Sequence, residues 1–259
     1  MPFSFKAAFG SGVNTFKSRY GSVLAAVVVF IVVMIGASIV QGVLNAALGI
    51  DTKMGDPTWV DFLVTIFFTN VLTAGLALMV LQIHRGESPR MGTLFAGFGR
   101  YWPLVGIGLL IHVIFMVIIL GVLLAGGLSL AVGATMAAPW TSSAFVVGPG
   151  FIIAGLIGLG LVLFFFTRFA FVALHCIDPK RQFGVAASFG ASWRTTGPIF
   201  WPLLGLMIVM LAILIVSIVL LVLPVIFVGI PLMFTVSVAA YELATGDASD
   251  SGEAATSLG

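Results

Sequence analysis

Five apolar stretches make up most of this chain, and each is long enough to cross a lipid bilayer. They run at about 21–49, 60–83, 102–127, 150–174 and 199–241, and a helix needs only ~20 apolar residues to span a ~30 Å hydrocarbon core. The last stretch is long enough for two crossings, and Pro224 favours a tight hairpin that divides it. A transmembrane barrel is excluded, because the apolar residues are continuous and do not alternate with polar ones. The sequence therefore predicts an all-α polytopic membrane protein with six transmembrane helices.

The composition supports a lipid environment for most of the chain. Hydrophobic residues make up 61% of the 259 residues and charged residues 8%, whereas soluble domains have roughly 25% charged residues. The first apolar stretch is longer than the core of a signal peptide and no small-residue cleavage site follows it, so we expect it to remain as a span. The net charge of +2 is too small to indicate a nucleic-acid partner. The single cysteine, Cys176, excludes an internal disulfide and a cysteine-based metal cluster, and no cofactor is expected.

The basic residues predict which side of the membrane the loops occupy. If the chain crosses six times, ten Lys and Arg residues fall on one side and Lys53 alone falls on the other. Basic residues accumulate in cytoplasmic loops, so both termini are expected in the cytoplasm. The ten residues are Lys6, Lys17, Arg19, Arg85, Arg90, Arg100, Arg168, Lys180, Arg181 and Arg194.

A near-repeat of five residues, WPLVG at 102–106 and WPLLG at 201–205, opens the third and fifth predicted spans. Tryptophan anchors at the headgroup level, and proline is tolerated in the first turn of a helix, where its missing N–H has no partner to lose. Each copy follows a segment that begins with proline and basic residues, PRMGTLFAGFGRY at 89–101 and PKRQFGVAASFGASWR at 179–194. We therefore expect an internal repeat of span, surface helix and span, used for spans two and three and again for spans four and five.

Both linkers of this repeat are expected to form short amphipathic helices on the cytoplasmic membrane surface. Their apolar faces are Met91, Leu94, Phe95 and Phe98 in the first linker and, more loosely spaced, Phe183, Ala186, Phe189 and Trp193 in the second. Because both linkers lie on the same side, the symmetry axis runs along the membrane normal. The inverted repeats that are common among transporters are therefore not indicated.

Longer stretches carry a resemblance to a known family. LQIHRGESPRMGTLFAGFGRYWPLVG (81–106) and ALHCIDPKRQFGVAASFGASWRTTG (173–197), followed by a proline-rich hairpin that ends in AAYEL (239–243), resemble a bacterial family of six-helix membrane proteins. Its members are stand-alone relatives of the membrane domain that precedes some glycerophosphodiester phosphodiesterases. The likeness covers about residues 20–245 and implies a six-helix fold in the bacterial plasma membrane. It implies no catalytic residues, because the phosphodiesterase reaction belongs to a separate soluble domain.

Polar side chains inside the predicted spans are the first candidates for a functional site, because lipid cannot solvate them. Asp61 begins a stripe that repeats every four residues in the second span, and Asn70 and His112 lie near mid-depth in the second and third spans. These groups would line a route for a solute or an ion. Alternatively, the threonines bond their own backbone carbonyls and Asp61 meets water outside the membrane. This polar seam comprises Asp61, Thr65, Thr69, Asn70, Thr73 and His112.

Six basic side chains are expected to ring the inner headgroup plane beside the surface helices. Such groups attract anionic lipid by about 1 kcal/mol each; alternatively, they only fix the topology. Arg100 and Arg194 each follow a phenylalanine by five residues, so we expect both to contact lipid phosphate or a carboxylate in equivalent ways. The candidate lipid-binding residues are Arg85, Arg90, Arg100, Lys180, Arg181 and Arg194.

The sequence has no nucleophile motif, no facing pair of carboxylates and no metal-binding pattern, so we expect no catalytic activity. The favoured function is a lipid-facing structural or accessory role, in which the chain binds anionic phospholipid or a partner membrane protein. The alternative is a small transporter or channel that uses the polar seam. The expected organisation is a cytoplasmic segment at 1–19, a membrane domain at 20–245 and a disordered acidic tail at 246–259.

Overall fold

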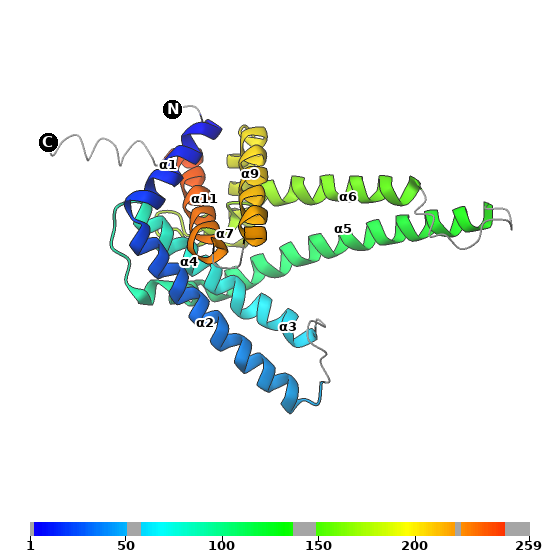
Figure 1. Ribbon diagram of the computed structural model, residues 1–259, viewed down its shortest axis with the longest axis horizontal. Helices are drawn as coiled ribbons and strands as arrows, with labels where there is room; N and C mark the ends of the chain where they lie inside the picture. Colours follow the sequence, from blue (N-terminus) through cyan, green and yellow to red (C-terminus); the bar gives the residue numbers. More distant parts are fainter. Residues whose placement is uncertain (1–2, 51–57, 137–148, 221–223, 247–259) are drawn as a thin grey trace.

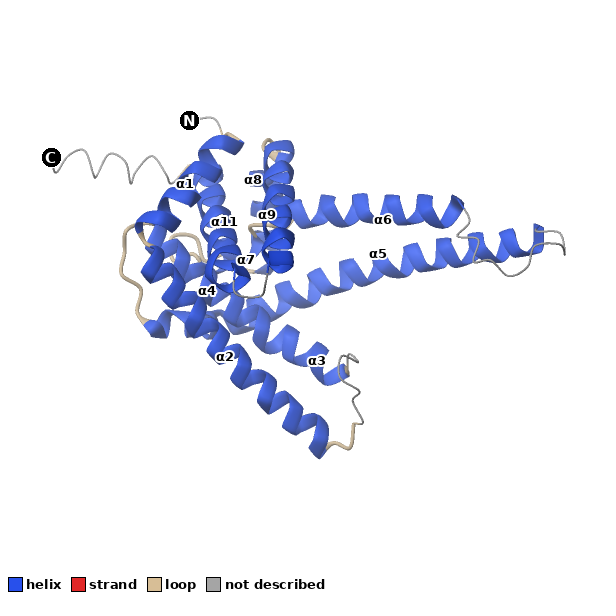
Figure 2. Ribbon diagram, viewed as in Figure 1, coloured by secondary structure: helices blue, strands red, loops and turns tan. Residues whose placement is uncertain are grey.

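The computed structural model describes residues 3–50, 58–136, 149–220 and 224–246, and all regular structure in these ranges is helical (Figures 1 and 2). Within them, six stretches are long and apolar enough to cross a membrane: Tyr20–Ala47, Trp59–His84, Met91–Leu128, Ile152–Ile177, Phe200–Val219 and Val225–Thr245. The all-α fold with six spans is therefore confirmed. The expected acidic tail, apart from Gly246, and the tip of the last hairpin lie outside the described residues.

A short helix, α1 (Phe5–Ser18), leads directly into the first span, α2 (Tyr20–Ala47). The hydroxyl of Ser4 caps α1 by accepting a hydrogen bond from the backbone N–H of Ala7 at 3.1 Å. Helix α1 then packs closely on the last span, because a Cβ atom at Gly12 would lie 2.5 Å from the Cα atom of Val236. The N-terminal segment is therefore part of the packed structure.

The second span is built from three pieces: α3 (Trp59–Val64), the π-helical turn η1 (Thr65–Thr69) and α4 (Asn70–His84). Thr58 and Asp61 form a capping box at its start, in which each side chain accepts a hydrogen bond from the backbone N–H of the other residue. After α4, Gly86 adopts a φ of +83°, a conformation that glycine tolerates best, and turns the chain away from the helix.

The order span, short helix, span then occurs twice. In the first copy, helix α4 is followed by the 3₁₀ helix η2 (Met91–Arg100) and then by α5 (Tyr101–Met136). In the second copy, the span consists of α6 (Pro149–Arg168) and α7 (Val172–Ile177). It is followed by α8 (Val185–Thr196) and then by α9 (Phe200–Leu220). The Trp-Pro pairs at 102–103 and 201–202 fall in the first turns of α5 and α9, where they were expected. The chain ends with the π-helical turn η3 (Val225–Gly229) and α11 (Ile230–Thr245).

The two linkers differ in detail. The first is a short helix, as expected, with 3₁₀ geometry. It lies backbone to backbone on α4: a Cβ atom at Gly75 would meet the carbonyl oxygen of Leu94 at 1.9 Å, and one at Gly97 would meet that of Val71 at 2.4 Å. The second linker, α8, is an α-helix that buries a face of small and polar residues, among them Ser188, Ser192 and Thr196.

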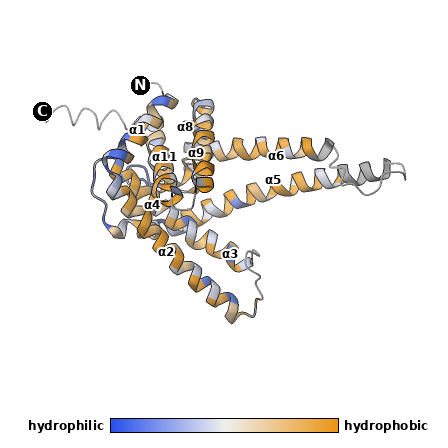
Figure 3. Cartoon of the chain, in the orientation of Figure 1, coloured by the Kyte–Doolittle hydropathy of each residue, from blue (hydrophilic) through white to orange (hydrophobic). Residues whose placement is uncertain are grey.

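The pairs α2–α3 and α5–α6 diverge from the rest of the molecule, as Figure 1 shows, and α9 and α11 stand beside each other near its centre. We call the part of the molecule where the short helices meet the span ends the hub; it consists of α1, η2, α7, α8 and the adjacent ends of α4 and α11. Spans two and six are the central ones, since 50% and 56% of their most apolar windows are buried, against 11–22% for the other four. The diverging helices carry mostly hydrophobic residues, as Figure 3 shows. Many of these side chains are exposed, which suits contact with lipid.

Candidate functional site

Three charged side chains from the ends of spans two, four and six form a buried ion-pair cluster in the hub: Arg85, Asp178 and Glu242. The guanidinium of Arg85 donates from Nη1 and Nη2 to the two carboxylate oxygens of Asp178 at 2.9 and 2.8 Å, and from Nε to Oε1 of Glu242 at 2.9 Å. The side chains of Arg85, Asp178 and Glu242 are 10%, 0% and 3% exposed. A bidentate arginine–carboxylate pair is among the strongest polar contacts in proteins.

Each member of the ion-pair cluster lies where a helix ends. Arg85 directly follows α4, Asp178 directly follows α7, and Glu242 lies in the last turn of α11. Asp178 accepts two further hydrogen bonds, from the hydroxyl of Tyr241 at 3.2 Å and from the backbone N–H of Lys180 at 3.1 Å. The cluster therefore fixes the ends of spans two, four and six against one another.

Burial and pairing act in opposite directions on the pKa values of this cluster. Burial disfavours the charged forms, which by itself would lower the pKa of Arg85 and raise that of Asp178. The contacts between them outweigh burial, so that the pKa of Arg85 lies above its ordinary value and the pKa of Asp178 lies below its ordinary value. Both groups are therefore ionised at neutral pH.

Two histidines connect the cluster region to neighbouring helices. His175 is 1% exposed; its Nδ1 atom lies 3.5 Å from the hydroxyl of Tyr241, and its Nε2 atom lies 3.5 Å from the hydroxyl of Thr195 on α8. Nδ1 of His84, at the end of α4, lies 2.8 Å from the hydroxyl of Thr15 on α1. Because a hydroxyl both donates and accepts, it serves either tautomer of the ring. The His84 contact therefore joins α1 to the end of span two, and the His175 contacts join α8 to the ends of spans four and six.

The hub holds no evident metal site within the described residues. No group of three or more His, Cys, Asp or Glu side chains there is placed to hold a metal ion. Cys176, between His175 and the end of α7, is buried. The carboxylates of the ion-pair cluster instead accept hydrogen bonds from Arg85.

Three of the six predicted lipid-binding residues contact protein groups. Arg85 donates to the carboxylates of Asp178 and Glu242 in the ion-pair cluster. Nη2 of Arg100 donates to the backbone carbonyl of Gln182 and lies 3.3 Å from Oε1 of the same residue. Nη2 of Arg181 lies 3.5 Å from the carbonyl oxygen of Thr245.

The other three predicted lipid-binding residues have exposed side chains: Arg90, Lys180 and Arg194. We call them the basic rim, because they flank the starts and ends of the two linkers. Arg90 directly precedes η2, Lys180 precedes α8, and Arg194 lies in the last turn of α8. These are the members of the predicted set that remain available to an external anion.

The two arginines of the repeat, Arg100 and Arg194, have different protein surroundings within the described residues, and their expected contacts with lipid phosphate stay a prediction. Helix η2 continues directly into α5, which holds Arg100 beside the second linker, whereas residues 195–200 separate Arg194 from Trp201. In the second linker a different arginine packs on the surface helix. The guanidinium of Arg168 lies 4.8 Å from the ring centre of Trp193 and also contacts the rings of Phe164 and Phe200.

The polar seam is divided into local contacts. At its outer end, Asp61 caps its own helix and accepts a hydrogen bond from the side-chain amide of Gln41. The hydroxyl of Thr73 donates to the carbonyl oxygen of Thr69 at 2.8 Å. Between them, the helix makes a π-helical turn from Thr65 to Thr69, which is wider than an α-helical turn.

The middle of the seam does bring Asn70 and His112 to one place. A Cβ atom at Gly108 would lie 2.3 Å from Nδ2 of Asn70, so the amide packs directly on that glycine. Nδ1 of His112 lies 2.7 Å from the carbonyl oxygen of the same Gly108. The ring of His112 also meets that of Phe62 edge-on at 5.9 Å. Nδ2 of Asn70 is buried and has no hydrogen-bond partner among the described residues.

Sequence reasoning missed the two carboxylates and the tyrosine of the hub. The signal that was available is position: Asp178, Tyr241 and Glu242 are the polar residues that close spans four and six, as Arg85 closes span two. A basic and an acidic residue at the ends of even-numbered spans lie at the same depth, which would have suggested a pair. The sequence did not indicate that they are buried.

Comparisons with protein-family models, with curated proteins and with solved structures find no match to this chain.

Proposed function

We propose that this chain is a non-catalytic integral membrane protein that binds anionic phospholipid at the hub ends of its spans, on the cytoplasmic side of a bacterial plasma membrane. The observation that carries the proposal is the outward face of the two linkers. Met91, Phe95 and Phe98 of η2 and Trp193 of α8 are 69%, 47%, 39% and 42% exposed, and two exposed residues of the basic rim, Arg90 and Arg194, are their neighbours in the chain.

Exposed aromatic residues next to basic ones suit the boundary between headgroups and acyl chains. Aromatic rings are favoured at headgroup depth, and each basic side chain near an anionic surface contributes about 1 kcal/mol. The three residues of the basic rim would together strengthen binding on the order of 100-fold. The apolar faces of the diverging spans leave room for a second kind of partner, another membrane protein.

The proposal is tested by measuring lipid retention. The chain is purified in mild detergent with a mixture of phosphatidylglycerol and phosphatidylcholine, and the bound lipids are counted by native mass spectrometry over a salt series. We expect Arg90→Gln/Lys180→Gln/Arg194→Gln to lose phosphatidylglycerol preferentially and to lose the salt dependence of its retention. Lys53→Gln, which removes the one basic residue assigned to the opposite side, is the matched control. Equal retention of phosphatidylglycerol in the triple variant and the control would overturn the proposal.

A second candidate function, transport of a small solute or ion, is favoured by one observation. The Nδ2 atom of Asn70 is buried at the junction of a π-helical turn and α4 and has no hydrogen-bond partner within the part of the chain that the structure describes, and π-helical turns occur often at functional sites. Proton flux into proteoliposomes that contain a pH-sensitive dye tests this alternative. Flux that is lost in Asn70→Leu or His112→Phe, with folding kept, would favour it; flux that equals that of empty liposomes would remove it.

A further inference from the structure

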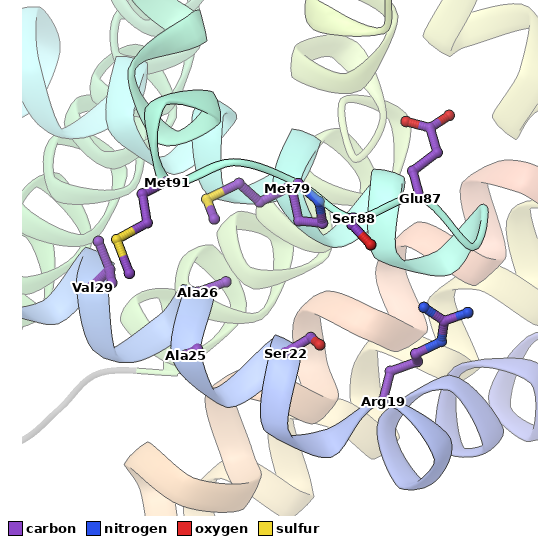
Figure 4. A pocket seen from close by; sticks show the side chains of 10 residues that line it. Arg19, Ser22, Ala25, Ala26, Val29, Met79, Glu87, Ser88 and Met91 are labelled. Atoms are coloured by element: carbon purple, nitrogen blue, oxygen red, sulfur yellow. The ribbon is translucent and has the colours of Figure 1, made fainter.

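A groove with a volume of about 230 Å³ lies between the start of α2 and the segment that joins α4 to η2 (Figure 4). One end of the groove is polar. Arg19 and Ser22 lie on the α2 side of this end, and Glu87 and Ser88 lie on the linker side. All four side chains are exposed.

The other end of the same groove is apolar. Val29 and Met91 lie there together, with Met79 on the wall formed by α4 and Ala25 on the wall formed by α2 (Figure 4). At 1.5 Å per helical residue, the ten residues from Arg19 to Val29 correspond to about 15 Å along the chain axis. The groove therefore runs from the start of the first span toward its middle and changes from polar to apolar on the way.

The polar end of the groove lies at the ends of two spans, which corresponds to the depth of the lipid headgroups. Arg19 directly precedes the first span and Glu87 lies three residues after the end of the second. The turn at Gly86 brings the linker backbone near Arg19, since a Cβ atom at Gly86 would lie 3.8 Å from Nη2 of Arg19. An amphiphile in this groove would have its polar group between the two span ends and its chains along α2.

The charges at the polar end select the headgroup. In the described part of the chain the ion pairs both involve Arg85, so Arg19 and Glu87 are not paired with each other. A headgroup with only a negative charge would meet repulsion from Glu87, and one with only a positive charge would meet repulsion from Arg19. A phosphate near Arg19, Ser22 and Ser88 together with an ammonium near Glu87 satisfies both.

We propose that this groove binds one phospholipid with a zwitterionic headgroup, its phosphate against Arg19 and its ammonium against Glu87. The inference rests on the proposed function in one respect, the placement of the hub at headgroup depth. It concerns a different lipid and different residues, because the basic rim takes anionic lipid at the linkers. The two therefore stand or fall by separate measurements.

The test uses the full chain, purified in mild detergent with an equimolar mixture of phosphatidylethanolamine and phosphatidylglycerol. Native mass spectrometry counts each lipid on the wild type, Arg19→Gln, Glu87→Gln and Ala25→Phe. The last variant fills the apolar end of the groove from an exposed position on α2 and leaves both charges in place. Arg194→Gln is the control outside the groove.

We expect each groove variant to lose retained phosphatidylethanolamine on the order of tenfold while it keeps its phosphatidylglycerol, and Arg194→Gln to show the reverse preference. Unchanged phosphatidylethanolamine in all three groove variants would overturn the inference. It would also be overturned if the groove variants lost phosphatidylglycerol instead, or lost both lipids alike. If the groove variants lost phosphatidylethanolamine as expected but Arg194→Gln lost no phosphatidylglycerol, the result would count against the proposed function and would leave the inference about the groove intact.

Discussion

A guanidinium that is removed from water needs nearby carboxylates, and Arg85 has two of them. Asp178 and Glu242 hold all three of its donor nitrogens at 2.9 Å or less. Replacing a whole buried ion pair with neutral groups is often close to neutral for stability, whereas removing one partner leaves an uncompensated buried charge. The stability of the hub should therefore depend more on whether the positive and negative charges of the ion-pair cluster offset each other than on how many charges the cluster has.

The first prediction follows from this balance. Arg85→Gln leaves two buried carboxylates without their cation, and we expect it to destabilise the protein by about 3–5 kcal/mol. The triple variant Arg85→Gln/Asp178→Asn/Glu242→Gln removes all three charges and should recover much of the loss. Thermal unfolding in mild detergent measures both, with the exposed Arg90→Gln as a control that should shift stability by no more than about 0.5 kcal/mol. A triple variant as unstable as Arg85→Gln would contradict the charge-balance argument.

The second prediction concerns pH. The pKa of Asp178 is lower in the folded protein than its ordinary value, so the carboxylate contributes stability that is fully present above the unfolded pKa of about 3.9. That contribution is lost as the pH falls through the still lower folded pKa. Thermal unfolding midpoints of the wild type should therefore drop as the pH is lowered below about 4, and the drop should be shallower in Asp178→Asn. Equal slopes in the two proteins would argue against this assignment.

At the scale of elements, the sequence predicted the spans well because their signal is local. Apolar runs mark where helices cross, and the Trp-Pro pairs mark where α5 and α9 begin. Which span ends meet is not local information: Arg85 pairs with residues 93 and 157 positions away. The form of η2 also escaped prediction, since its close approach to α4 depends on two glycines from different elements, Gly75 and Gly97.

The third prediction tests that close approach. Gly75→Ala or Gly97→Ala places a methyl group within 1.9 or 2.4 Å of a backbone carbonyl oxygen, so η2 has to move away from α4. Overpacking of this kind costs typically about 1–3 kcal/mol, which thermal unfolding and protease protection of the first linker would register. Gly99→Ala is the matched control in the same 3₁₀ helix, because a Cβ atom there would meet nothing within 4 Å. Equal losses in Gly97→Ala and Gly99→Ala would refute the backbone contact.

At the scale of the whole molecule, the hub and the distribution of basic residues both bear on how many times the chain crosses the membrane. The ion-pair cluster joins the ends of spans two, four and six, and Arg100 at the start of span three reaches the linker after span four. If every apolar run of the chain crosses completely, these ends share one membrane side. The contacts in the hub and the one-sided basic residues therefore favour the same zigzag of six crossings.

The last prediction follows from that zigzag. With Cys176→Ser as background, a cysteine at Ser88, after span two, should lie in the cytoplasm, and one at Met54, before span two, should lie outside. A membrane-impermeant maleimide added to intact cells should label Met54→Cys at once and Ser88→Cys only after permeabilisation. A fluorescent reporter fused after Gly259 should fluoresce in the cytoplasm, because six crossings return the chain to the side of its N-terminus. Labelling of Ser88→Cys in intact cells, with Met54→Cys protected, would reverse the orientation; labelling of both from outside would mean that span two does not cross.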